Sequence, residues 1–139
     1  MQKTEFIQRM IGIPWADRAC AFDACDCWGL VVLYYRHVLG IELHHSAGYE
    51  AGKDFLTCYR DEVVFWHSTN TPCDDCVFVG YVGERAEHIG LIVDGAALHS
   101  RGEGGGVRHD RVRVIERMFT KLEYLTYADY RDSTCTGPG

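Results

Sequence analysis

Cys27 stands in a sequence context that favours a reactive thiol. Asp26 before it is a good helix N-cap, and a long apolar run follows it. A thiol in the first turn of a helix lies near unpaired N–H groups and the positive end of the helix dipole, which favour its thiolate and can bind an oxyanion. We therefore predict that Cys27 is a nucleophile and the first thiol of this chain to be alkylated. The alternative is a buried structural cysteine, because cysteine is among the most buried residue types.

The element that must position this thiol is a helix. Residues 28–35 include two β-branched valines and would also suit a central strand, but the flanking residues favour a helix. Arg36 and His37 stand where cations complement a helix C-terminus, and Gly40 stands where a left-handed residue is expected. We predict a helix from residue 27 to about residue 39, in which Gly29 allows close approach to another surface.

The stretch Asp26-Cys27-Trp28-Gly29-Leu30-Val31, preceded by Ile11-Gly12-Ile13-Pro14-Trp15, resembles the NlpC-like cell-wall cysteine peptidases. The tryptophan after the cysteine resembles their phage tail-assembly branch, and the resemblance covers about residues 5–131. It implies an α+β, papain-like fold, with N-terminal helices that carry the nucleophile at a helix N-terminus and pack against an antiparallel β-sheet. It also implies a substrate, peptidoglycan stem peptides cut typically between D-glutamate and a diamino acid, and a role in a phage tail that opens the cell wall.

A cysteine nucleophile needs a base within hydrogen-bond reach, and in papain-like enzymes a histidine from the packed sheet supplies it. His88-Ile89-Gly90 matches the His-x-Gly motif of the resembled family. Strand alternation places His88 and Gly90 on one face and Ile89 and Leu91 on the other. We expect His88 to be the general base; the alternative is a satisfied structural histidine.

His99 is the candidate for the residue that orients His88. Asp94-Gly95 between two apolar runs is a strong hairpin signal, and counting back from a two-residue turn pairs Gly90 with His99. His99 would then share a face with His88 as its diagonal neighbour, about 7 to 8 Å away. The resembled family often has an orienting histidine here, which supports the assignment. A longer turn would instead leave His99 as a solvent-facing strand residue.

Three further residues are candidates for substrate binding: Trp15, Asp26 and Trp28. Trp15 occupies the place of a family tyrosine that is thought to reach the active site. An indole N–H donates one hydrogen bond but does not titrate like a phenol, so we expect Trp15 to be a cleft wall or donor, or simply to pack in the core.

Length and charge bound the remaining possibilities. With 139 residues the chain is expected to form a single domain over residues 1–139, with residues 133–139 as a frayed tail. The net charge is −6 and the 14 lysines and arginines are scattered, which argues against a nucleic-acid partner. The chain has no apolar run long enough for a signal peptide or membrane span, so we expect it to be made in a cytoplasm and at first to stay there. The resemblance implies that this is the host cytoplasm and that the protein is carried in the virion tail beside other tail-tip proteins.

The chain has an odd number of cysteines, which favours free thiols over a disulfide framework: Cys20, Cys25, Cys27, Cys58, Cys73, Cys76 and Cys135. We expect no cofactor and no metal. Two alternatives remain open. One is a zinc site formed by Cys25, Cys27, Cys73 and Cys76, although a zinc site would not explain the capped helix or the His88 hairpin. The other is a catalytically inactive structural tail-tip protein on the same fold, which residues that differ from the family pattern, such as Trp15, allow.

Other expected elements complete the fold. They are a first helix capped by Thr4 with Phe6, Ile7, Met10 and Ile11 on its apolar face, a loop over residues 16–26, a helix from Tyr49 to about Trp66, a strand over residues 76–82, a glycine-rich rim loop over residues 101–106, a strand over residues 107–115 and an edge strand over residues 124–130.

Overall fold

The computed structural model describes residues 1–43, 66–69, 71–102 and 105–127, and in them helices pack against a six-stranded antiparallel sheet. The strand order is β3-β8-β4-β5-β6-β7, with each neighbouring pair antiparallel, so the expected α+β class is confirmed. In chain order the elements are α1 (Lys3–Met10), β1 (Cys20–Ala21), β2 (Ala24–Cys25), α2 (Cys27–Tyr34), a π-helical turn (Tyr35–Leu39), β3 (Trp66–Thr69), β4 (Val77–Val82), β5 (Arg85–Val93), β6 (Ala96–Ser100), β7 (Val107–Arg111), α5 (Val112–Met118) and β8 (Lys121–Tyr127).

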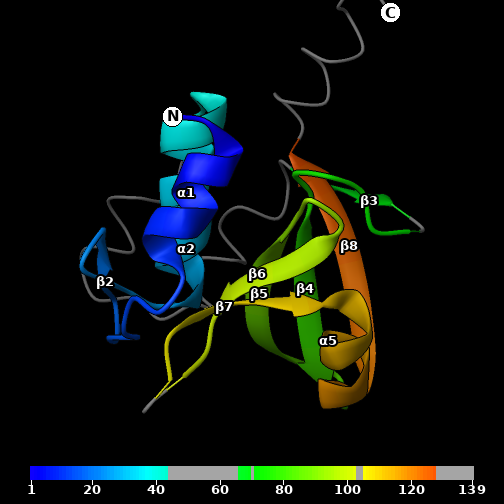
Figure 1. The fold of residues 1–139 in the computed structure, drawn as a ribbon. Helices are drawn as coiled ribbons and strands as arrows, with labels where there is room; N and C mark the ends of the chain where they lie inside the picture. Colours follow the sequence, from blue (N-terminus) through cyan, green and yellow to red (C-terminus); the bar gives the residue numbers. More distant parts are fainter. Residues whose placement is uncertain (44–65, 70, 103–104, 128–139) are drawn as a thin grey trace, which may run out of the picture.

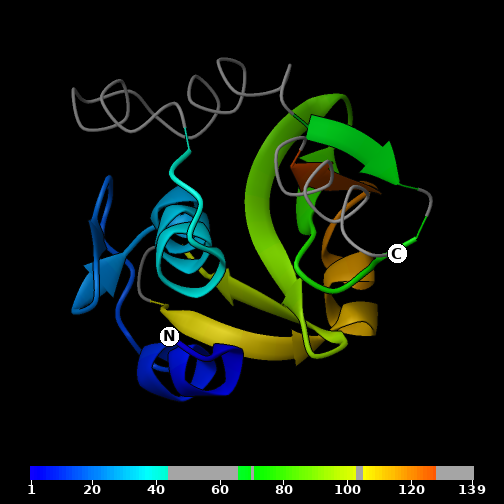
Figure 2. The ribbon, with the colours of Figure 1, turned by 90° about the horizontal axis from the view of Figure 1, so that it is seen from above.

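The sheet separates two apolar clusters. Figures 1 and 2 show α1 and α2 on one side of the curved sheet and α5 on the other. The α2 side is packed by the odd-numbered residues Ile89, Leu91 and Val93 of β5, whereas Ile92 packs with Ile115 of α5. This alternation is the one that the sequence predicts for β5.

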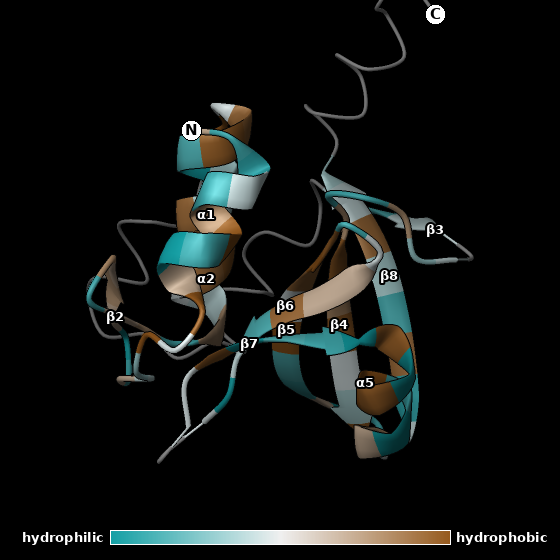
Figure 3. Cartoon of the chain, viewed as in Figure 1, coloured by the Kyte–Doolittle hydropathy of each residue, from teal (hydrophilic) through white to brown (hydrophobic). Residues whose placement is uncertain are grey.

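The helix that carries Cys27 is buried on every side. All residues of α2 are buried, which fits its apolar composition, and Figure 3 shows its hydrophobic segments beside the more hydrophilic segments of α1. Its continuation is π-helical, and Gly40 ends it in the left-handed region with φ 72°. The predicted helix from residue 27 to residue 39 is therefore confirmed, with a wider last turn than expected. Among the residues that the structure describes, no helix is long and apolar enough to span a bilayer.

The first helix differs from the prediction at both ends. Phe6, Ile7 and Met10 are buried as expected, but Ile11 is 50% exposed because the chain leaves the helix there. Gln2 rather than Thr4 is the N-cap residue, and no side chain caps the helix.

The β5–β6 hairpin forms as the sequence predicts. Asp94 and Gly95 both have positive φ, 54° and 75°, as a type I′ turn requires. The register counted from this turn is confirmed, since Leu91 lies opposite Leu98.

Several predicted elements are wrong or lie outside the described residues. The strand expected over residues 107–115 ends at Arg111, because Val112, Ile115 and Met118 recur at helical spacing and pack as α5. The edge strand expected near residue 124 is β8, which has β3 on one side and β4 on the other. Residues 16–26 contain the short β1–β2 hairpin instead of only a loop. The helix expected over residues 49–66 and the tail over residues 133–139 fall outside the described residues, apart from Trp66, which begins β3.

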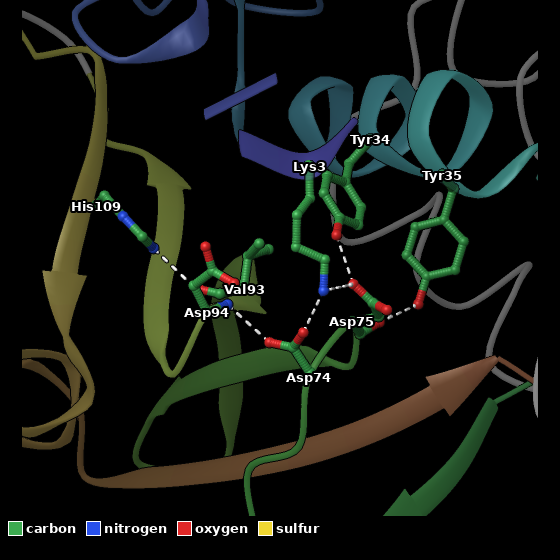
Figure 4. A network of polar contacts seen from close by, with 8 residues as sticks. All are labelled: Lys3, Tyr34, Tyr35, Asp74, Asp75, Val93, Asp94 and His109. Atoms are coloured by element: carbon green, nitrogen blue, oxygen red, sulfur yellow. Dashed lines mark hydrogen bonds and ion pairs between the residues drawn. The ribbon is translucent and has the colours of Figure 1, made fainter. Parts of the chain in front are cut away.

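A polar network fastens α1 and α2 to the sheet (Figure 4). The Lys3 ammonium pairs with Asp74 and lies 3.7 Å from Asp75 Oδ1, in the turn that precedes β4. The Tyr34 hydroxyl donates to the Asp75 carboxylate, and the Tyr35 hydroxyl donates to the Asp75 carbonyl at 2.8 Å. Because both tyrosines belong to the helical segment that begins at Cys27, this network fixes how that segment sits on the sheet.

Candidate active site

Cys27 is the first residue of α2 and is only 9% exposed. Burial raises the pKa of its thiol to about 12, and the charge of Asp26 acts in the same direction. The backbone N–H groups of Ile89, Trp28 and Cys27 itself face the sulfur and oppose this effect without overcoming it. The sequence-based expectation of a favoured thiolate is therefore wrong for this structure, because burial outweighs the helix N-terminus.

The chain before Cys27 is held by buried backbone contacts. The Ser100 hydroxyl at the end of β6 donates to the Cys25 carbonyl at 2.8 Å. The Cys25 N–H donates to the Pro14 carbonyl at 3.2 Å. The start of α2 is thus tied both to the N-terminal segment and to the strand that carries His99.

Gly29 allows the close approach that the sequence suggests. A Cβ atom at this position would lie 2.1 Å from the Ala19 carbonyl oxygen. The Asp26 carboxylate bonds to both sides of this contact, since its Oδ1 accepts from the Gly29 N–H at 2.8 Å and its Oδ2 accepts from the Arg18 N–H at 3.0 Å. The turn before the hairpin therefore packs directly on the first turn of α2.

His88 and His99 meet on one face of the sheet. His88 Nε2 lies 2.9 Å from His99 Nδ1, so the two rings share a face, as the hairpin count predicts. Gly90 leaves room for this pair, because a Cβ there would lie 2.7 Å from His99 Cβ. On its other side His99 Nε2 lies 2.8 Å from Asp110 Oδ2, and the Arg108 guanidinium bonds the same carboxylate at 3.1 Å. The result is a continuous polar chain across β5, β6 and β7.

Aromatic rings enclose His88. The Phe119 ring, directly after α5, stacks on the imidazole with 5.8 Å between ring centroids and 18° between planes, and the Phe78 ring meets it edge-on at 5.8 Å. Gly80 makes the stack possible, because a Cβ there would lie 2.6 Å from the Phe119 ring. Phe119 also lines a surface cavity of about 300 Å³ between α5 and β8.

Both imidazoles are neutral near pH 7. Burial lowers the pKa of His88 to about 3, and the neighbouring His99 and Arg101 add to the effect. Burial also lowers the pKa of the fully buried His99, although its hydrogen bond to Asp110 opposes the shift. A neutral imidazole keeps one lone pair and is therefore able to accept a proton.

The sulfur of Cys27 faces the backbone next to His88. The Ile89 N–H faces the sulfur, yet the Ile89 side chain packs on the α2 side while His88 packs against Phe119 on the other. Within the described part of the chain no hydrogen bond joins Cys27 to His88, and His88 Nδ1 has no partner. Catalytic hydrogen bonds are often long in the absence of substrate, so this geometry is compatible with a nucleophile and base that meet on binding.

The three predicted substrate-binding residues occupy different positions. Trp15 is half-buried, and its backbone N–H donates to the Gly105 carbonyl at 3.2 Å, beside the glycine-rich loop. Trp28 is fully buried in the core and Asp26 is only 4% exposed, with both carboxylate oxygens used to hold the start of α2. The prediction that Asp26 and Trp28 contact substrate does not fit these positions.

The described cysteines give no support to a zinc site. No disulfide joins the described cysteines Cys20, Cys25, Cys27, Cys73 and Cys76, and no group of three or more possible ligands comes together in the part of the chain that the structure describes.

Asp110 and Phe119 are the residues of this site that sequence reasoning missed. His88, His99 and Asp110 follow one another at intervals of 11 residues, one per strand. That interval was a usable signal, but the turn between β6 and β7 is glycine-rich and does not fix a register by its sequence.

Comparisons with known proteins agree with this arrangement. Residues 14–125 match the NlpC/P60 family, which comprises cysteine peptidases and peptidoglycan hydrolases. Among solved structures, the chain is similar to the "NlpC/p60 domain of peptidoglycan hydrolase SagA", with a TM-score of 0.58 and 14% identity over 88% of this chain and 92% of that one. This likeness confirms the papain-like fold. No curated protein matches the chain. Because the family match spans most of its length, this protein belongs to the NlpC/P60 family.

Proposed function

We propose that this protein is a cysteine endopeptidase that hydrolyses peptidoglycan stem peptides, with Cys27 as nucleophile and His88 as general base. The observation that supports it best is the position of Cys27, at the capped start of a buried helix with its sulfur against the backbone of Ile89, next to the His88–His99 pair. Family membership supplies the reaction class.

The reaction begins from a neutral pair, since burial keeps Cys27 as a thiol and His88 as an imidazole. With His88 Nε2 held by His99, the His88 Nδ1 takes the thiol proton as the sulfur bonds to the carbonyl carbon of the bound substrate. The Cys27 backbone N–H stabilises the oxyanion. His88 then gives the proton to the leaving amine, and a water molecule hydrolyses the thioester, which restores the thiol.

The substrate and setting follow from the resemblance of the cysteine motif. We place the cleaved bond between D-glutamate and a diamino acid of the stem peptide. Trp28, the tryptophan after the nucleophile, supports a phage tail protein that acts during cell-wall penetration. On this proposal the protein is made in the host cytoplasm, works in the virion tail and contacts other tail-tip proteins, and Trp15 lines the substrate cleft.

A second candidate function is a structural tail-tip protein that keeps the fold without the activity. The packing of the His88 ring on Phe119, without a hydrogen bond to Cys27 in the described residues, and the raised pKa of the thiol favour it. The two candidates differ in whether the protein cleaves peptidoglycan at all.

The test is product mass spectrometry after incubation with purified peptidoglycan. Wild-type protein is expected to release peptides with a new amino terminus, and Cys27→Ala is expected to release none while its circular dichroism is unchanged. Cys73→Ala removes an exposed thiol and is the matched control, which should cleave like the wild type. Cleavage by Cys27→Ala would overturn the assignment of the nucleophile, and an inactive wild type would favour the structural candidate.

A further inference from the structure

We propose that Asp110 is a positioning residue that acts through His99 to determine which nitrogen of His88 carries the proton. The inference rests on the proposed function for its catalytic consequence, but the proton positions are measurable without any activity.

Asp110 continues the diagonal that begins at His88. In the β6–β7 ladder His99 lies opposite Arg108, so Asp110, two residues further on, is its diagonal neighbour on the same face. The two bonds of the chain have ordinary lengths, 2.9 Å from His88 Nε2 to His99 Nδ1 and 2.8 Å from His99 Nε2 to Asp110 Oδ2. The middle ring, His99, is fully buried, so water does not compete for either of its nitrogens.

The Asp110 carboxylate determines which nitrogen donates in each hydrogen bond from His88 to His99 to Asp110. Asp110 is a carboxylate at neutral pH because hydrogen bonds from Arg108 and His99 lower its pKa, although burial opposes them. An ionised carboxylate only accepts, so a hydrogen bond at His99 Nε2 requires the proton on that nitrogen.

The proton positions then follow one after another. Neutral His99 with its proton on Nε2 has a lone pair on Nδ1, and this lone pair must accept from His88. His88 is also neutral, so its single proton sits on Nε2 and its Nδ1 is left as a lone pair. Nδ1 is the nitrogen that has no partner in the described structure, and it is the one that the proposed mechanism uses as base.

A neutral amide in place of the carboxylate removes this bias. In an Asp110→Asn variant the side-chain amide would present either an oxygen acceptor or an N–H donor to His99 Nε2. When the amide donates, the proton of His99 moves to Nδ1, His88 Nε2 becomes the acceptor and the His88 proton moves to Nδ1. In that state His88 has no lone pair free for the Cys27 thiol.

The charged and titratable groups near the hydrogen-bonded chain His88–His99–Asp110 come from the neighbouring strands. Arg108 and Asp110 belong to β7 and Arg101 follows β6, and both arginines act to keep His99 neutral. Cys27 on α2 approaches the backbone beside His88. The Asp110 carboxylate is thus the anion that opposes these cations.

The direct test is nitrogen-15 NMR of the histidine rings, which distinguishes the two neutral tautomers and the cation. In the wild type near pH 7 we expect both His88 and His99 to carry the proton on Nε2. In Asp110→Asn we expect a signal from the tautomer with the proton on Nδ1, and Asp110→Glu should restore the wild-type signature. Asp17→Asn, which removes an exposed carboxylate elsewhere, is the matched control and should leave both rings unchanged.

Activity is a second, separate readout. We expect Asp110→Asn to lower kcat by about 10- to 100-fold, the size of effect seen for groups that orient metal-ligating side chains through a hydrogen bond, with little change in KM. A wild-type His88 with its proton on Nδ1 would overturn the inference even if Asp110→Asn failed to fold, and unchanged tautomers in a folded Asp110→Asn would also overturn it. An inactive wild type that shows the expected tautomers supports the positioning chain and contradicts the proposed function instead.

Discussion

Substitution of Gly29 by alanine tests whether the start of α2 depends on direct contact with the turn before it. In an exposed helix this change stabilises by about 1 kcal/mol, because alanine has the higher helix propensity. Here the new Cβ would lie 2.1 Å from the Ala19 carbonyl oxygen, a distance that no relaxed structure tolerates. The sign of the effect should therefore reverse.

The size of the effect follows from the bonds that a shift would break. Moving Ala19 away from the helix separates it from the Asp26 N–H, which donates to its carbonyl at 3.1 Å, and moves the Arg18 N–H away from Asp26 Oδ2, now at 3.0 Å. Each group left buried without a partner costs about 1–3 kcal/mol. After the helix gain is subtracted, we expect Gly29→Ala to lower the free energy of unfolding by about 3 kcal/mol.

Urea unfolding followed by circular dichroism measures this difference. Gly102→Ala is the matched control, because a Cβ there meets nothing within 4 Å, and it should change stability by less than about 0.5 kcal/mol. Hydrolysis should fall as well, by about 100-fold for a 1 Å displacement of the nucleophile. A Gly29→Ala protein as stable as the wild type would refute the argument that this contact holds Cys27 in place.

Two further predictions concern the thiols and the histidines. Substoichiometric iodoacetamide at pH 7 should label the exposed Cys73 before the nearly buried Cys27, and peptide mapping that found Cys27 labelled first would restore the sequence-based expectation of an activated thiol. The free energy of unfolding should fall as the pH drops from about 6.5 toward about 3, because unfolded histidine takes up a proton near pH 6.5 while folded His88, with its pKa lowered to about 3, does not. The upper limit for the contribution of His88 to this pH dependence is about 1.4 kcal/mol per pH unit, and the actual slope should be smaller because the ring is only half-buried. His88→Gln should flatten the urea-derived curve, and an equally steep curve in that variant would contradict the prediction.

The parts of the site that the sequence predicts are those set by local signals. The Asp26 cap and Gly40 bound the helical segment, and the Asp94-Gly95 turn determines the β5–β6 register, so Cys27 and the His88–His99 contact follow from residues close in the chain. Each of these inferences needed only one element and the residues that flank it.

The parts that the sequence does not predict depend on distant segments. Asp110 reaches His99 only through the β6–β7 register, and Phe119 reaches His88 only because α5 returns to the far face of the sheet. The pKa of Cys27 also depends on distant segments, since the helix N-terminus is a local effect while burial comes from the whole fold. Tertiary packing reversed the direction that local reasoning gave.

The end of β6 connects the two halves of the site. Successive residues of a strand point to opposite faces, and here His99 points to His88 and Asp110 while Ser100 points to the Cys25 carbonyl, two residues before Cys27. A slip of one residue in this strand would exchange the two faces and lose both contacts together. The β5–β6 turn and the pairing of β6 with β7 therefore do more than build the sheet, because they keep the His88–His99 pair and the helix that begins at Cys27 in a fixed relation.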